Sequence, residues 1–224
     1  MNEANLEVER MGNLWLLHVG YCDNIDLLSN IVKESPTLRW LRIHLSTQEV
    51  GSSMERNASI HKFFNIIREN LHELQVLEVI NCNFLASTSC EYLNMIALRQ
   101  LTLLKCKNLE NFLTGIDHII TLEELYISQC DGFQTIQKQM SKWTCLKVLS
   151  ITCCETLQHL PIGISKLSTL EKLNFSRCRS LKEIPEGVGG LTNLKKLDMQ
   201  ACEALERFPL GLGQPLSVGG FGFL

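Results

Sequence analysis

Residues 146–193 read LKVLSITCCETLQHLPIGISKLST followed directly by LEKLNFSRCRSLKEIPEGVGGLTN, so one pattern of 24 residues occurs twice in succession. In both copies apolar residues or Cys occupy positions 1, 4, 6, 9, 12, 15, 19 and 22. A fixed period of this length is typical of solenoids, in which each coil buries its apolar face only by stacking on its neighbours. The stretch therefore predicts a solenoid.

The same frame extends through most of the 224 residues. The second repeat has 36 residues, with an insertion near 47–59. We expect a polar loop over Gln48–Ser59, followed by an amphipathic helix from Ile60 to Leu71. We predict a single domain over 1–224, with a partial repeat at 1–13, eight repeats over 14–217 and a truncated last repeat at 218–224 whose strand spans 218–223. The eight repeats begin at Leu14, Leu38, Leu74, Leu98, Leu122, Leu146, Leu170 and Leu194.

The pattern also predicts the shape of each coil. Apolar positions 4 and 6 alternate with more polar neighbours, which is the period of a strand with one buried face. Pro161, Pro185 and Pro209 occupy position 16, where a fixed φ and a missing N–H favour a 3-10 or extended segment over a long α-helix. We therefore expect an α/β fold, a curved horseshoe with a parallel sheet on its concave face and short helical, 3-10 or extended segments on its convex face.

Seven of the ten cysteines occupy position 9, and Ser46 replaces the thiol in the second repeat. One thiol per coil predicts a buried column of reduced cysteines rather than a disulfide framework. The N-terminal MNEANLEVER has no apolar stretch of the kind that a secretion signal requires. Together these features favour a cytoplasmic protein. The column comprises Cys22, Cys82, Cys106, Cys130, Cys154, Cys178 and Cys202.

Several function classes find no support in the sequence. The net charge is −3 from 21 basic and 24 acidic residues without long blocks, which argues against nucleic acid and anionic membrane surfaces. His72-Glu73 resembles the start of a zinc-protease motif, but Val76 stands where the second His is required, and the chain has no CxxC pair. We predict no enzyme activity, no cofactor and no metal.

The segments CCETLQHLPIGI, CRSLKEIPEGV and CEALERFPLGL share the pattern CxxLxxLPxxI. This pattern over 14–217 resembles the leucine-rich repeat region of plant intracellular nucleotide-binding, leucine-rich-repeat immune receptors. Ser89, Leu113 and Gln137 depart from the resemblance where it expects Pro. The phosphate-binding GxxxxGK[ST] is also absent, so the switching function of those receptors does not carry over.

The resemblance implies a protein-recognition scaffold with a role in plant defence and disease resistance, which binds a protein partner on its concave face. One alternative is an adaptor or substrate-receptor subunit of a larger assembly such as a ubiquitin ligase. A further alternative is a contact with domains of a longer protein outside this sequence.

The concave positions 3, 5, 7 and 8 are apolar and aromatic in the N-terminal repeats and mixed in charge in the C-terminal ones. Trp, Tyr and Arg are enriched at the energetic centres of interfaces, and clustered exposed apolar groups indicate a partner. The alternative for each residue is that it only covers a neighbour on a solvated sheet. The partner-binding candidates are Tyr21, Trp40, Arg42, His44, Glu78 and Tyr126, within an exposed patch that also includes Leu16, Leu45, Val76, Ile80 and Leu104.

Overall fold

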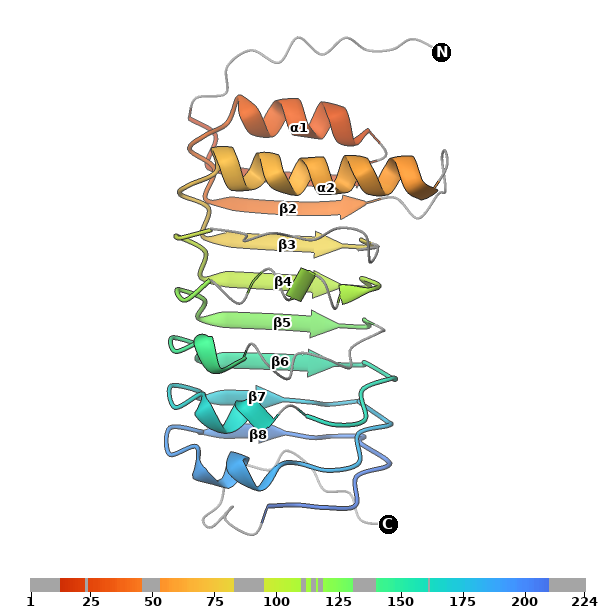
Figure 1. Cartoon of the computed structure of the whole chain (residues 1–224), viewed down its shortest axis with the longest axis vertical. Helices are drawn as coiled ribbons and strands as arrows, with labels where there is room; N and C mark the ends of the chain where they lie inside the picture. The colour runs from red at the N-terminus through yellow and green to blue at the C-terminus, as the bar shows by residue number, and fades with distance from the viewer. Residues whose placement is uncertain are drawn as a thin grey trace.

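The computed structural model describes residues 13–22, 24–45, 53–82, 95–109, 112–113, 116, 119–130, 140–160 and 162–209. Eight parallel strands form one open sheet in the order β1 to β8, stacked coil upon coil (Figure 1). Every strand begins at position 3 of its repeat, which confirms the predicted leucine-rich repeat solenoid. The strands are β1 (Leu16–Cys22), β2 (Trp40–Leu45), β3 (Val76–Ile80), β4 (Gln100–Leu104), β5 (Glu124–Ser128), β6 (Val148–Thr152), β7 (Lys172–Asn174) and β8 (Lys196–Asp198).

The pairing register follows the repeat frame. Residues at the same repeat position pair across neighbouring strands, so His18, Arg42 and Glu78 lie side by side on β1, β2 and β3. The exception is the end of β1, where the register shifts and Cys22 pairs with Leu45. The extra length of the second repeat does not disturb this register, because Trp40 still pairs with Val76. The insertion is therefore accommodated outside the sheet.

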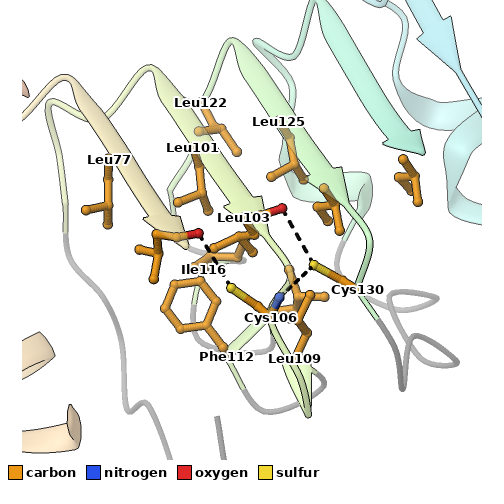
Figure 2. Packing of buried hydrophobic residues seen from close by; sticks show 14 of the residues in the cluster. Leu77, Leu101, Leu103, Cys106, Leu109, Phe112, Ile116, Leu122, Leu125 and Cys130 are labelled. Carbon is orange, nitrogen blue, oxygen red and sulfur yellow. Dashed lines mark hydrogen bonds between the residues drawn. The ribbon is translucent and has the colours of Figure 1, made fainter. Parts of the chain in front are cut away.

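The core lies behind the sheet and runs through every coil. Leu101 and Leu103 on β4 are fully buried, as is Leu125 on β5, and Figure 2 shows them lined up across adjacent strands. Phe112, which lies after β4 in the same coil, is also buried in this core. Its ring contacts that of Phe64, with ring centroids 5.4 Å apart. Because each coil covers the next, burial of apolar area at roughly 25 cal/mol per Å² is shared along the whole stack.

At the N-terminal end of the sheet, α-helices cover the core on the side away from the strands. α1 (Ile25–Lys33) and α2 (Ser53–Asn70) lie side by side over the first coils (Figure 1). Asn24 caps α1, since its side-chain oxygen accepts the Leu27 N–H at 2.9 Å. Among the described residues no helix has the length and apolar character that a bilayer crossing requires.

The later coils use short 3-10 segments instead. These are η3 (Met140–Lys142), η4 (Ile162–Lys166) and η5 (Glu186–Gly190), and Pro185 stands directly before the last of them. The short 3-10 segments predicted for the coils with Pro at position 16 are therefore confirmed in η4 and η5, and η3 forms in a coil that carries Gln137 there.

The predicted loop at 48–59 is wrong over its second part, because α2 already begins at Ser53. Residues 53–59 contain Met, Glu, Arg and Ala and neither Gly nor Pro, and such residues favour a helix without an apolar stripe. Residues 46–52, which include Ser46, lie outside the described residues. So do Cys90, the partial repeat at 1–12 and the strand predicted at 218–223, so the predicted domain boundaries stay a prediction.

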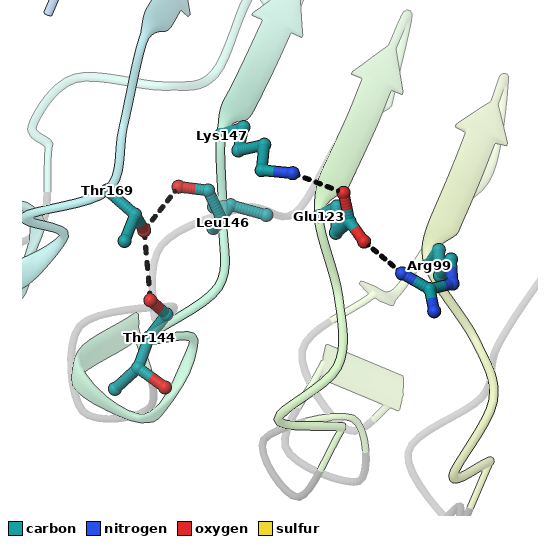
Figure 3. A network of polar contacts seen from close by, with 6 residues as sticks. All are labelled: Arg99, Glu123, Thr144, Leu146, Lys147 and Thr169. Atoms are coloured by element: carbon teal, nitrogen blue, oxygen red, sulfur yellow. Dashed lines mark hydrogen bonds and ion pairs between the residues drawn. The ribbon is translucent and has the colours of Figure 1, made fainter. Parts of the chain in front are cut away.

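Polar side chains join neighbouring coils at the edge where the strands begin. Glu123 forms ion pairs with Arg99 in the preceding coil and with Lys147 in the following coil, the latter at 2.7 Å (Figure 3). The Thr169 hydroxyl lies 2.9 Å from the carbonyl oxygens of both Thr144 and Leu146. These contacts satisfy the turn carbonyls and fix the register between coils.

Candidate protein-binding face

The concave face is the sheet face that carries positions 3, 5 and 7 of each repeat, opposite α1 and α2. Strand alternation turns these side chains away from the core, as in β2, where Leu41 and Ile43 are buried and the intervening residues are not. Candidate residues from different repeats therefore meet on one surface.

Three of the candidates form one connected group, the Trp40 group, which comprises Trp40, Arg42 and Glu78. The Trp40 indole N–H donates to Oε1 of Glu78 at 3.2 Å. Arg42 Nε lies 3.4 Å from Oε2 of the same carboxylate, within ion-pair range but without the geometry of a hydrogen bond. Only 14% of the Glu78 side chain is exposed, against 43% of Arg42. Glu78 is thus a partly covered support that holds two more exposed side chains.

Two further candidates form the Tyr21 group, which comprises Tyr21, His44 and Asn81. The rings of Tyr21 and His44 are 4.1 Å apart between centroids, and His44 Nε2 lies 2.9 Å from Asn81 Nδ2. The ring of Tyr21 is held in place although its side chain is 73% exposed. Asn81 escaped the sequence analysis, and the signal that could have found it is its place at position 8, shared with Tyr21.

Position 8 has a special backbone in most coils. Seven residues there have φ between 51° and 61°, the left-handed region that non-glycine residues rarely adopt. From β3 to β6 this residue directly follows the strand, whereas Tyr21 lies inside β1, where the pairing register shifts. The seven residues are Tyr21, Asn81, Lys105, Gln129, Cys153, Arg177 and Ala201.

Tyr126 lies apart from both groups. It is on β5 and pairs with Thr102 and Ser150, so β4 separates it from Glu78. Its hydroxyl donates to Oε2 of Glu124 at 2.8 Å. Burial, together with that hydrogen bond, raises the pKa of Tyr126 to about 12. The hydroxyl therefore stays protonated at neutral pH and is already engaged within its own strand.

Two members of the expected exposed patch are buried. Leu45 is 2% exposed because β2 continues through position 8 without the left-handed turn, and the alternation places that side chain toward the core. Ile80 is 6% exposed although it lies outside the core cluster, because it pairs between His44 and Leu104, whose side chains flank it. The apolar concave surface is thus narrower than predicted and centres on Leu16 and Trp40, with Val76 and Leu104 half-buried.

The C-terminal part of the concave face differs in character. Lys172 and Lys196 are exposed at position 3 of β7 and β8, and Asp198 is half-exposed. The described residues contain no group of three His, Cys, Asp or Glu side chains placed to hold a metal ion.

Comparison with known proteins places this geometry in a family. The Zer-1-like leucine-rich repeat family matches residues 65–196, more than half of the chain. The chain belongs to this family. The Zer-1-like match includes Glu78 and Tyr126 but begins after the segment with Tyr21, Trp40, Arg42 and His44. Family membership therefore accounts for the solenoid fold. It does not account for the side chains of Tyr21, Trp40, Arg42 and His44 on the N-terminal concave face.

Solved structures similar to the Zer-1-like chain share its fold at low sequence identity. The leucine-rich repeat domain of the type III effector XopL is 20% identical with a TM-score of 0.57, over 81% of this chain and 59% of that one. A TDR receptor is 14% identical with a TM-score of 0.56, over 88% and 34%. The ectodomain of the receptor kinase GASSHO1/SCHENGEN3 from Arabidopsis thaliana, in complex with CASPARIAN STRIP INTEGRITY FACTOR 2, is 15% identical with a TM-score of 0.53, over 79% and 23%.

The chain thus spans less than two thirds of each of these structures. The curated proteins contain no significant match to this chain.

Proposed function

We propose that this chain is a recognition scaffold that binds a protein partner through the N-terminal half of its concave face. The observation that carries the proposal is the pairing of two pre-arranged groups on adjacent strands, the Trp40 group and the Tyr21 group. Trp, Tyr and Arg contribute most binding energy at interfaces, and here each is exposed on one side and held on the other.

Pre-arrangement favours binding because side chains that are already ordered lose less entropy when a partner arrives. The Trp40 indole is fixed by its bond to Glu78, and the Tyr21 ring is fixed against His44. The alternative, that these residues only cover neighbours, fits Glu78, whose side chain is largely buried, better than the exposed Tyr21.

For the biological setting, we propose a role in plant defence, like that of the repeat region of a disease-resistance receptor. The CxxLxxLPxxI pattern of the C-terminal repeats supports it. The partner of this face is either a separate protein or a domain outside this sequence. A cytoplasmic location is part of the proposal and is supported by the nine described cysteines, all of which are thiols.

A second candidate is a substrate-receptor subunit of a ubiquitin ligase. The Zer-1-like family match favours this candidate. The two candidates share the concave binding face and differ in what the bound partner undergoes. Ubiquitylation of the partner in the presence of this chain, and its loss with Trp40→Ala, supports the second candidate over the first.

The test of the binding face uses a partner captured from the native tissue and then purified. Isothermal titration with Trp40→Ala and Arg42→Ala is expected to show a loss of about 1–3 kcal/mol in binding free energy for each. The matched variants Lys172→Ala and Asp198→Ala at the other end of the sheet are expected to cost less than about 1 kcal/mol. A larger loss from the second pair places the site in the C-terminal half and contradicts the proposal.

A further inference from the structure

The guanidinium of Arg42 is only partly engaged within the Trp40 group. Arg42 Nε lies 3.4 Å from Glu78, and among the described residues the Arg42 side chain makes no other ion pair or hydrogen bond. A guanidinium presents its donors in a rigid fork that matches a carboxylate. With 43% of its side chain exposed on the concave face, Arg42 is open to solvent on that side.

The concave surroundings of Arg42 hold little competing negative charge beyond Glu78. His18 pairs directly with Arg42 across β1 and β2, and His44 lies two residues further along the same face of β2. Glu78 is the sole carboxylate described on the concave face of β1 to β4, and its two oxygens already face Trp40 and Arg42. The next described concave carboxylate is Glu124 on β5, two strands or roughly 10 Å beyond Glu78.

The floor beside Arg42 is apolar. Leu16, Trp40 and Val76 pair in one row across β1, β2 and β3, at the position two residues before the row of His18, Arg42 and Glu78. An extended peptide that crosses these strands meets an apolar row and, about 7 Å away, a polar row that contains the Arg42 guanidinium. That spacing suits a segment in which apolar and acidic side chains alternate.

We infer that the N-terminal concave face recognises an acidic, partly apolar peptide segment of its partner, with a carboxylate bound by the terminal nitrogens of Arg42. Glu78 acts here as a positioning residue that holds the Trp40 indole through its hydrogen bond. The inference rests on the proposed function and names the chemistry of the partner for that same face.

The experiment compares two synthetic peptides that carry fluorescein. The acidic probe alternates Glu or Asp with Leu over eight residues between terminal glycines, and the control probe replaces each acid with its amide. Fluorescence polarisation with the full chain is expected to show at least tenfold tighter binding of the acidic probe. Binding is expected to weaken as NaCl rises from 50 to 500 mM, because exposed charge pairs are screened.

Variants separate this site from general charge attraction. Arg42→Gln is expected to reduce the preference for the acidic probe to less than twofold, and Arg42→Lys to give an intermediate preference because it keeps the charge without the fork. Lys172→Gln, the matched control on β7, is expected to change nothing. Glu78→Gln is expected to raise affinity for the acidic probe severalfold, because it removes a like charge and keeps an acceptor for Trp40. Near-ultraviolet circular dichroism verifies that each variant is folded.

The outcomes are decisive in both directions. Equal binding of the two probes, no binding of the acidic probe, or an equal effect of Lys172→Gln and Arg42→Gln overturns the inference, and so does weaker acidic binding by Glu78→Gln. If the purified partner still requires Trp40 while the acidic preference is absent, the inference fails and the proposed function stands. If the partner binds Trp40→Ala as tightly as the natural chain, the proposed function fails as well.

Discussion

The thiol of Cys178 donates to the carbonyl oxygen of Ile151 in the preceding coil, with sulfur and oxygen 3.2 Å apart. The same contact, from the position-9 thiol to a carbonyl 27 residues earlier, recurs for Cys106, Cys130 and Cys202 at 3.5, 3.6 and 3.0 Å. Figure 2 shows two of these bonds beneath β4 and β5. Each thiol thus satisfies a carbonyl where the chain leaves the sheet, and the column joins consecutive coils.

Removal of one thiol from this column is expected to destabilise the fold. Cys178 is fully buried, so Cys178→Ala leaves both a small cavity and an unsatisfied carbonyl. We expect a loss of about 1–3 kcal/mol in the free energy of unfolding, measured by urea denaturation. The exposed Cys145 provides the matched control, and Cys145→Ala is expected to change stability by less than about 0.5 kcal/mol. Equal effects of the two variants contradict a structural role for the column.

The buried thiols are expected to remain protonated and unreactive in the folded protein. Burial raises the pKa of Cys178 from its ordinary value of 9.0 to about 12. Native protein at pH 8 should therefore react rapidly with Ellman's reagent at exposed Cys145 and slowly at Cys178. After denaturation without reductant all ten cysteines should react. A count of six or fewer indicates disulfides and removes the main support for a cytoplasmic location.

The same shift predicts how stability depends on pH in the alkaline range. The unfolded chain releases the Cys178 proton near pH 9, whereas the folded chain holds it to about pH 12. The stabilisation is therefore fully present below pH 9 and is lost as the pH rises toward 12. Urea denaturation from pH 8 to 11 should show a smaller loss of stability for Cys178→Ala than for the natural chain.

The ion pairs around Glu123 predict an effect in the acid range. Hydrogen bonds from Lys147 and Arg99 hold the pKa of Glu123 below its ordinary value of 4.5. Its contribution is present above that value and is lost as the pH falls through the lowered folded pKa. Glu123→Gln should therefore lose less stability than the natural chain between pH 7 and pH 3. At neutral pH its effect should be smaller than that of Cys178→Ala, because exposed ion pairs contribute little.

Two tryptophans, Trp143 and Trp15, are expected to respond very differently to substitution. Trp143 is fully buried and its indole N–H donates to the Ile116 carbonyl at 3.2 Å, whereas Trp15 is exposed. Trp143→Ala should cost about 3–5 kcal/mol of stability, and Trp15→Ala less than about 0.5 kcal/mol. Thermal unfolding followed by circular dichroism measures both. A large loss from Trp15→Ala contradicts its assignment to the surface.

The sequence alone predicted the fold because the residues that must be buried recur with a fixed period of 24 residues. Eight apolar positions repeat in every copy of the frame from Leu98 to Asn193, and an alternating pair among them, positions 4 and 6, defines each strand. The Cys column was predictable for the same reason. The thiols of Cys22 and Cys202 are only half-buried, because they belong to the first and last described coils.

What the frame could not predict lies where local backbone departs from it. Leu45 was expected on the concave face. Unlike Tyr21 and Asn81 at the same repeat position, Leu45 has no left-handed backbone, so the alternation of β2 buries its side chain. The start of α2 at Ser53 was not predicted for a different reason. The first turns of this helix follow helix propensity and lack an apolar pattern.

The sequence by itself determined that positions 3, 5 and 7 of each repeat lie on the concave face, since a period of two separates the two faces of a strand without any knowledge of neighbours. Only the tertiary structure decided which of them meet. Trp40 and Glu78 are 38 residues apart and share a hydrogen bond. They meet because the insertion of the second coil lies outside the sheet and β3 pairs with β2 in the register of the repeat. Tyr21 reaches His44 because Tyr21 itself has a left-handed backbone, which turns its ring toward the neighbouring strand. Such contacts depend on side-chain direction between coils, which a pattern read along one chain does not contain.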